Sequence, residues 1–214
     1  MAGRREPARV RQRRAEDRPD EIIAAALALF AEKGFAATRM DDIAKAAGLS
    51  KAGVYLYFPS KAEVFKAAVR TTIVPIVAHV ESLSRSFTGS SEDLLRRLVG
   101  EIVRATAGPA GVIPKIVMSE AGNFPDIARF YAGEVVSRGF GLISTVIARG
   151  VARGEFVAMP GGMAPFAVIS PILMLALWNN GIGRALGQPL DPSAYVDAVY
   201  SVLARGLLVR EGGA

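Results

Sequence analysis

The amino-acid sequence predicts an all-α protein. Apolar residues recur at three- to four-residue spacing along most of the 214 residues, and we find no stretch with the strict alternation of a half-buried strand. Apolar residues make up 51% of the chain, enough for a sizeable core. Glycine and proline separate the periodic segments, which gives about nine helices. The main breaks after the first four helices are Gly89, Gly108-Pro109, Gly122-Asn123, Pro160-Gly161-Gly162 and Gly187-Gln188-Pro189.

The first four helices have recognisable beginnings and ends. The first begins at Pro19-Asp20 and ends at Gly34, the second runs from about Arg39 to Gly48 with Thr38 as its N-cap, and the third covers 51–58, between Ser50 and Pro59. Ser60-Lys61-Ala62-Glu63 is a capping box that opens a fourth helix at once.

The remaining helices are expected near 61–87 with a bend at Pro75, 91–107, 114–121, 125–153, 162–186 and 192–210. This layout predicts a basic flexible arm at 1–18, a small helical domain at 19–66 and a helical bundle at 67–214. The arm contains seven arginines and no apolar periodicity. It is either a solvated tail or a segment that reaches DNA phosphates or the minor groove.

Charge and composition restrict the function. The net charge is +6, and residues 1–61 hold a surplus of 4 positive charges against a surplus of 2 in the rest, so the N-terminal part is the better partner for a polyanion. The absence of cysteine and the single histidine, His79, exclude thiolate and multi-histidine metal sites. We expect no metal, no cofactor and no enzyme activity, because no nucleophile, base and acid set is visible. The apolar stretch 163–178 is short for a membrane span and contains Ser170-Pro171, so we expect a buried helix and a cytoplasmic protein.

Two short helices joined by Gly48-Leu49-Ser50 form a predicted helix-turn-helix. Small residues such as Ala44 and Gly48 allow the two helices to cross closely. The second helix begins with an exposed group that suits entry into a DNA major groove, namely Lys51, Ala52, Gly53 and Tyr55. Free N–H groups at the helix starts near Arg39, Lys51 and Lys61 suit phosphate binding. The Thr38 hydroxyl and the phenols of Tyr55 and Tyr57 add donors, although Tyr57 also fits a core position and Arg39 also fits a solvated one.

The segment from Asp20 to Lys66 resembles the N-terminal domain of TetR-family transcription regulators. The matching residues are Ile23-x-x-Ala26-x-x-Leu29-Phe30-x-x-x-Gly34-Phe35, Thr38, Asp42-Ile43-Ala44, Ala47-Gly48-Leu49-Ser50-Lys51 and Val54-Tyr55-x-Tyr57-Phe58-Pro59-Ser60-Lys61. The resemblance implies operator contacts at Thr38, Lys51, Tyr55, Tyr57 and Lys61. Gly53 departs from the pattern, because many members have Thr or Ser there, and glycine offers no side chain to a phosphate.

The resemblance and the apolar C-terminal helices together imply a ligand-responsive homodimer. We expect a repressor that binds an approximate inverted repeat in double-stranded DNA and is released by a small, largely apolar effector. The candidate pocket residues are Met118, Phe130, Phe140, Phe166, Met174 and Trp178. The last two helices are apolar on more than one face and carry small residues, a pattern typical of a four-helix dimer interface or of burial within one subunit.

Overall fold

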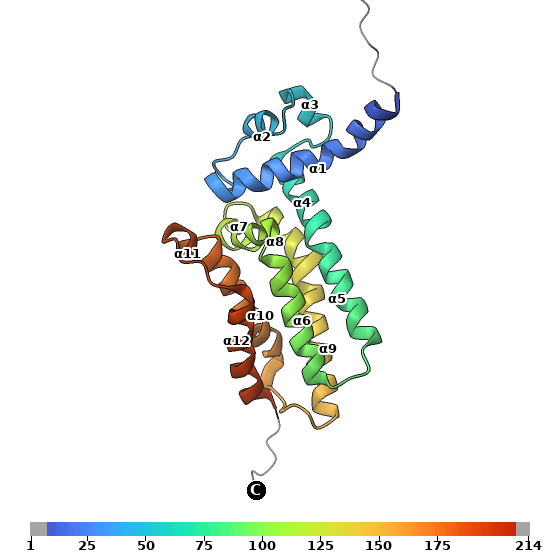
Figure 1. The fold of residues 1–214 in the computed structure, drawn as a ribbon, viewed down its shortest axis with the longest axis vertical. Coiled ribbons are helices and arrows are strands. Elements are labelled where there is room, and N and C mark those ends of the chain that lie inside the picture. Colours follow the sequence, from blue (N-terminus) through green and yellow to red (C-terminus); the bar gives the residue numbers. More distant parts are fainter. Residues whose placement is uncertain (1–7, 209–214) are drawn as a thin grey trace, which may run out of the picture. The chain divides into compact units, whose positions relative to one another are not determined.

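The computed structural model describes residues 8–208, with the side chains of 8–17, Pro109 and Gly161 left out. The chain divides into two compact units, Met1–Ala68 and Val69–Ala214 (Figure 1). The described part is helical, with one isolated antiparallel bridge between Phe156 and Leu208. The expected all-α class and the two-part layout of a small N-terminal helical domain followed by a larger helical one are confirmed.

The N-terminal unit is built from α1 (Ala8–Lys33), α2 (Met40–Ala46), α3 (Lys51–Tyr55) and the first part of α4 (Lys61–Thr72). Three buried rings form its centre: Phe35 lies 5.1 Å from Phe30 and 5.7 Å from Phe65 between ring centroids. Gly34 and Gly48 end α1 and α2 with φ of +83° and +65°, conformations that glycine adopts at little cost.

The start of the first helix differs from the expected one. Residues 1–7 of the expected arm lie outside the described residues, whereas α1 begins at Ala8 and includes Pro19. The residues before Pro19 are mainly Arg, Gln, Ala and Glu, which are strong helix formers. Because the packed part of α1 already provides a helical nucleus, these residues can extend it without an apolar face of their own.

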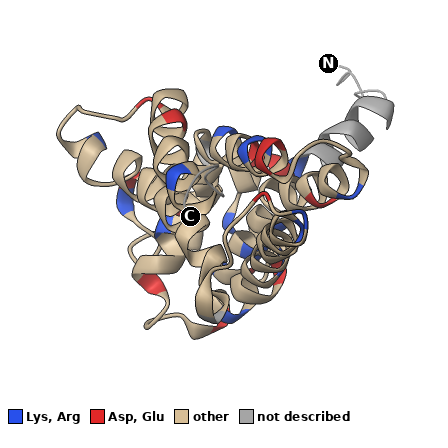
Figure 2. Ribbon diagram, turned by 90° about the horizontal axis from the view of Figure 1, so that it is seen from below, with Lys and Arg blue, Asp and Glu red and all other residues tan. Residues whose placement is uncertain are grey.

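The C-terminal unit contains the end of α4 and the remaining helices. These are α5 (Val74–Ser86), α6 (Ser91–Thr106), η1 (Pro109–Gly111), α7 (Val112–Glu120), α8 (Pro125–Tyr131), η2 (Ala132–Val136), α9 (Ser137–Ala152), η3 (Pro160–Gly162), α10 (Ala164–Asn179), α11 (Ile182–Ala185) and α12 (Pro192–Leu207). The core is formed chiefly by α6, α9, α10 and α12, with α6 packed against α5, α9, α10 and α12. Basic and acidic residues are interspersed along the helices (Figure 2).

Three of the nine expected helices are subdivided, and the short helices η1 and η3 lie at two of the expected breaks. The helix expected at 61–87 breaks at Ile73, just before Val74-Pro75, because proline has no N–H to continue the hydrogen-bond ladder. The helix expected at 125–153 contains a π-helical turn, η2. The helix expected at 162–186 is interrupted at Asn180-Gly181, before α11.

Two helical stretches, Pro125–Ala152 and Ala164–Ala185, are long and apolar enough to cross a membrane by length and composition alone. Both also supply residues to the core of the C-terminal unit, among them Ile143, Val146, Val168 and Ile172. Other apolar residues of these stretches line the cavity and the groove described below. Packing within the unit and the walls of these two hollows account for part of their apolar character, since 22% and 28% of their most apolar windows are buried.

Candidate nucleic-acid interface and ligand cavity

The helix-turn-helix of the N-terminal unit consists of α2 and α3. Ile43, Ala44 and Val54 are buried between the helices, and the Leu49 N–H donates to the Ala44 carbonyl at 2.9 Å, which closes the turn. Ser50 caps α3 as expected, with its Oγ accepting from the Gly53 N–H at 3.0 Å. The sequence therefore folds locally into the predicted motif.

The exposed side of α3 holds several of the predicted DNA contacts. Lys51 and Ala52 are exposed, Gly53 is half-buried and Tyr55 is 44% exposed. α3 is shorter than the expected helix at 51–58, because the backbone before Pro59 is disfavoured in the α conformation. Tyr57 then lies in the following turn and is 39% exposed, so it is not a core residue.

Lys51 is held by an ion pair on the same surface. Its Nζ lies 2.9 Å from Asp41 Oδ1, and both side chains are more than half exposed. The hydrogen bond to Asp41, aided by the carboxylate charge, raises the pKa of Lys51, so the ammonium stays charged. Arg39 is exposed at the start of α2, where its own N–H donates to Asp42 Oδ2 at 3.1 Å. The N-cap of α2 is therefore Arg39, whose N–H is bonded by the Asp42 carboxylate, and the expected N-cap at Thr38 is wrong.

Thr38 and Lys61 are placed differently from the expected phosphate contacts. The Thr38 side chain is 1% exposed, and its hydroxyl donates to the Gly34 carbonyl at 2.7 Å. The Lys61 ammonium donates to the carbonyls of Phe35, Ala36 and Thr38, and lies 4.5 Å from the centroid of the Phe35 ring. Both side chains hold the α1–α2 connection together, because the carbonyls after α1 have no helical partners of their own.

One exposed residue beside these was missed by the sequence analysis. Leu56 is 85% exposed, between Tyr55 and Tyr57. An apolar side chain at this position suits contact with a thymine methyl group in the major groove. The sequence pattern could have predicted that Leu56 is exposed, because a leucine between two tyrosines at a helix end falls outside the apolar stripe of α3.

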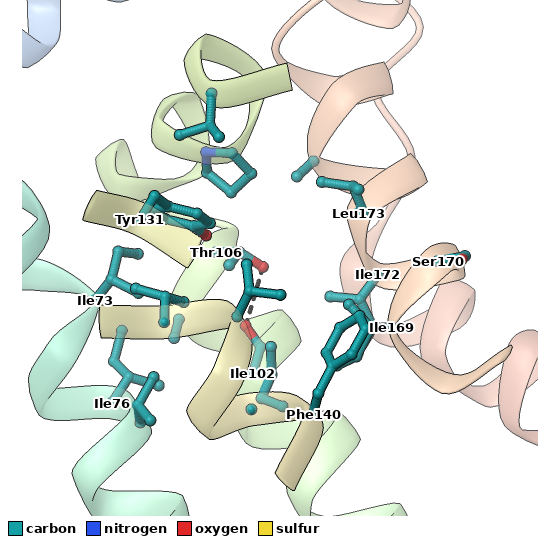
Figure 3. A pocket seen from close by; sticks show the side chains of 18 of the residues that line it. Ile73, Ile76, Ile102, Thr106, Tyr131, Phe140, Ile169, Ser170, Ile172 and Leu173 are labelled. Carbon is teal, nitrogen blue, oxygen red and sulfur yellow. Dashed lines mark hydrogen bonds between the residues drawn. The ribbon is translucent and has the colours of Figure 1, made fainter. Parts of the chain in front are cut away.

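The C-terminal unit contains a cavity of about 460 Å³, a size typical of small-molecule sites. Its walls come from α5, α6, α7, α10 and the continuous stretch of α8, η2 and α9 (Figure 3). The described residues that line it are all uncharged, and most are aliphatic. Its hydroxyl groups belong to Thr106, Tyr131 and Ser170.

Half of the predicted pocket residues line this cavity. Met118, Phe140 and Phe166 do, and the rings of Phe140 and Phe166 meet edge to face with centroids 4.8 Å apart. The other three do not line it. The Phe130 ring lies under the Arg70 guanidinium at 4.8 Å, Met174 faces an outer groove and the Trp178 indole donates to the Gln188 carbonyl at 3.0 Å.

The π turn explains why Tyr131, which the sequence analysis missed, replaces Phe130 in the cavity wall. Tyr131, Val136 and Phe140 all line the cavity. Residues five apart point well away from one another in an α-helix of 3.6 residues per turn, whereas a π turn brings them to one face. The i, i+5 pair of Tyr131 and Val136 therefore shares a face only because η2 is π-helical.

An outer groove lies between α10 and α12. Its lining includes Phe166, Ser170, Met174, Tyr195, Val202 and Leu203. Met174 is 54% and Val202 70% exposed, so apolar side chains on this face are open to solvent. Phe166 and Ser170 belong to both hollows, which therefore share a wall.

Comparison with known proteins agrees with both units. Residues 22–68, which include every predicted DNA contact, match the family described as bacterial regulatory proteins, tetR family. The chain is 43% identical over 56 residues to the uncharacterized HTH-type transcriptional regulator YfiR of Bacillus subtilis, and 43% identical over 51 residues to IcaR of Staphylococcus aureus, a negative regulator of the biofilm operon icaADBC. These matches cover 26% and 24% of this chain and 27% of each relative, about a quarter of their length.

Solved structures extend the likeness of fold to nearly the whole chain. PfmR of Thermus thermophilus, a TetR-family regulator, is 25% identical with a TM-score of 0.69, and the alignment covers 88% of this chain and 99% of PfmR. The ketosteroid regulator KstR2 of Mycobacterium tuberculosis is 21% identical with a TM-score of 0.74, over 90% of this chain and 96% of KstR2. Residues 22–68 thus carry the DNA-binding domain of the tetR family, and the described chain as a whole has the fold of solved TetR-family regulators.

Proposed function

We propose that this protein is a homodimeric transcription repressor that binds an inverted-repeat operator and is released by a small, largely apolar ligand. The observation that carries the DNA-binding part is the exposed surface of α3. There the small residues Ala52 and Gly53 allow close approach to a base edge, and Lys51 and Tyr55 supply donors. Repression is supported by IcaR, whose name describes a negative regulator. Members of the family are not enzymes, and a regulator of bacterial type acts in the cytoplasm, where the DNA is.

The dimer is proposed to form through α10 and α12. The groove between them exposes Phe166, Met174 and Val202, and monomeric proteins rarely leave large apolar patches uncovered. A dimer that binds an inverted repeat needs its two α3 helices in successive major grooves, about 34–36 Å apart. Val202→Glu is expected to give monomers in light scattering. A dimer that persists in this variant and in Met174→Glu would contradict this interface.

The cavity is proposed as the effector site. Ile73 and Ile76 lie at the α4–α5 break and line the cavity, and α4 continues along the chain into the N-terminal unit. A ligand that packs against this break acts on the segment that connects the two units. It shifts the equilibrium between DNA-binding and released forms only by its difference in affinity for the two, typically about 1–3 kcal/mol.

The central test is DNA binding by the full chain. Fluorescence anisotropy would measure affinity for a duplex from the region upstream of its own gene, with an unrelated duplex of equal length as reference. Tyr55→Ala is expected to lower affinity for the first duplex strongly and to keep the helical circular dichroism unchanged. Lys45→Ala, at an exposed position on α2, is the matched control. Equal affinity for both duplexes, or an unfolded Tyr55→Ala variant, would contradict the proposal.

A further inference from the structure

The three hydroxyl groups that line the cavity differ in their hydrogen bonding and exposure. Thr106 donates its hydroxyl proton to the Ile102 carbonyl at 3.0 Å, within its own helix. Ser170 is on the exposed part of α10 that also borders the groove. The Tyr131 hydroxyl has no hydrogen-bond partner among residues 8–208, although its ring is packed into the cavity wall. In Figure 3 the Tyr131 ring extends into the space enclosed by the labelled side chains, on the side of Thr106.

The backbone holds Tyr131 in this position at some cost. Tyr131 is the last residue of α8, and the π turn that follows it brings it to the face of Val136 and Phe140. π turns are rare and occur frequently at functional sites. The Ser137 hydroxyl donates to the Ala132 carbonyl at 2.8 Å, which supports the widened turn. The chain thus uses an unusual turn to place an unpaired phenol in an apolar cavity.

One ion pair lies beside the cavity. Arg138 and Glu81 lie next to lining residues, on α9 and α5, and form a bidentate ion pair at 2.9 and 2.8 Å. Each therefore has its charge satisfied by the other. A charged ligand group placed among the uncharged lining residues would lose its hydration without gaining a counter-ion, which is strongly unfavourable.

Burial raises the pKa of Tyr131 to about 12, so the phenol is protonated at neutral pH and acts as a donor. Tyr131 is half-buried, and a ligand that fills the cavity excludes water from its hydroxyl. The donor is then left unpaired, at a cost in free energy, unless the ligand supplies an acceptor.

We propose that the effector is an uncharged, predominantly apolar molecule with a neutral oxygen acceptor, such as a ketone or ester carbonyl, that accepts a hydrogen bond from Tyr131. This inference rests on the proposed role of the cavity as the effector site. It excludes free carboxylates and ammonium compounds as the tight-binding class, even where their apolar part fits.

The test compares probes that share a hydrocarbon chain and differ in the polar end. Isothermal titration calorimetry on the full chain would measure binding of methyl nonyl ketone, undecanoate and undecylamine at neutral pH. Gly139→Leu serves to block the cavity, because Gly139 lines it and a Cβ there meets open space, and leucine also favours the helix. Tyr131→Phe removes only the hydroxyl, and no hydrogen bond within the described chain is lost with it.

The ketone is expected to bind at least tenfold more tightly than the two charged probes. Tyr131→Phe should weaken ketone binding by about three- to tenfold, the range of one net hydrogen bond, and leave the binding of undecanoate unchanged. Undecanoate that binds as tightly as the ketone, with both blocked by Gly139→Leu, would overturn the ligand class but keep the cavity as a binding site. Equal ketone affinity in Tyr131→Phe and wild type would overturn the role of Tyr131. Failure of all three probes to bind, or binding that Gly139→Leu does not affect, would overturn the cavity's proposed role and this inference with it.

Discussion

Replacing Lys61 by methionine separates two possible roles of this residue. The resemblance to TetR-family regulators implies a phosphate contact, whereas the ammonium donates to three backbone carbonyls, those of Phe35, Ala36 and Thr38. Lys61→Met keeps most of the aliphatic side chain and removes the charge. The carbonyls then lose their donor, at a point where α1 has ended and supplies none.

The expected loss of stability follows from these contacts. A hydrogen bond to a charged group contributes about 1.5–3 kcal/mol, and the ammonium over the Phe35 ring adds about 0.5–1 kcal/mol. The three bonds share one ammonium that is only half-buried, so the contributions do not add in full. We expect the free energy of unfolding of the N-terminal unit to fall by about 2–4 kcal/mol.

Urea unfolding followed by circular dichroism, together with the salt dependence of DNA binding, would test this. Lys45→Met, at an exposed position on α2, is the control and should change stability by less than about 0.5 kcal/mol. The slope of log affinity against log salt should be the same in Lys61→Met as in wild type. An unchanged unfolding free energy with a slope reduced by about one would refute the structural role and restore the phosphate contact.

Three further changes have definite expected outcomes. Asp41→Asn frees Lys51 from its ion pair and removes a negative charge beside the proposed DNA-binding surface. Affinity for any duplex, measured by fluorescence anisotropy at low salt, should rise about three- to tenfold. Lower affinity would contradict the exposed position of Lys51. Gly53→Ser places a Cβ 3.2 Å from Ser50 Oγ, a close contact that a small shift relieves. The serine adds a hydroxyl donor for a phosphate and favours the helix, so operator affinity should rise several-fold. Reduced affinity would indicate that the glycine is needed for close approach to the DNA. The hydrogen bond from Arg138 lowers the pKa of Glu81, against the opposing effect of burial. The ion pair therefore stabilises the fold above pH 4.5, and this stabilisation is lost as the pH falls through the lowered pKa. Glu81→Gln should therefore cost about 1 kcal/mol at pH 7 and nothing near pH 2, as measured by urea unfolding at both pH values.

The N-terminal unit was largely predictable because its signals are local. Ser50 caps α3 through a side chain and a backbone N–H three residues apart, and Gly34 and Gly48 end helices through their own φ angles. The roles of Thr38 and Lys61 were not predictable in the same way. Each depends on carbonyls brought together by the α1–α2 turn, and Lys61 is 26 residues away in sequence from Phe35.

The cavity was predictable as a region but not as a set of residues. Met118, Phe140 and Phe166 line it, yet aromatic and methionine residues elsewhere on the same helices face other surroundings, as Phe130 and Met174 do. Residue type does not distinguish these faces, since each residue is apolar and each helix has more than one apolar side. Only the contacts of the neighbouring helices decide which side is enclosed.

The π turn is the clearest case of information that an α-helical pattern does not carry. A regular α-helix traced back from Phe140 passes through Val136 and then through Ala132 or Gly133, and leaves Tyr131 on another face. The extra residue in η2 reverses this, so that the phenol rather than the Phe130 ring meets the cavity. Sequence periodicity therefore located the helix correctly but could not identify Tyr131 as a cavity-facing residue. The same displacement gives a largely apolar site a phenol donor that a ligand can use. The proposed ligand chemistry therefore depends on the backbone conformation of η2 as well as on which residues line the cavity.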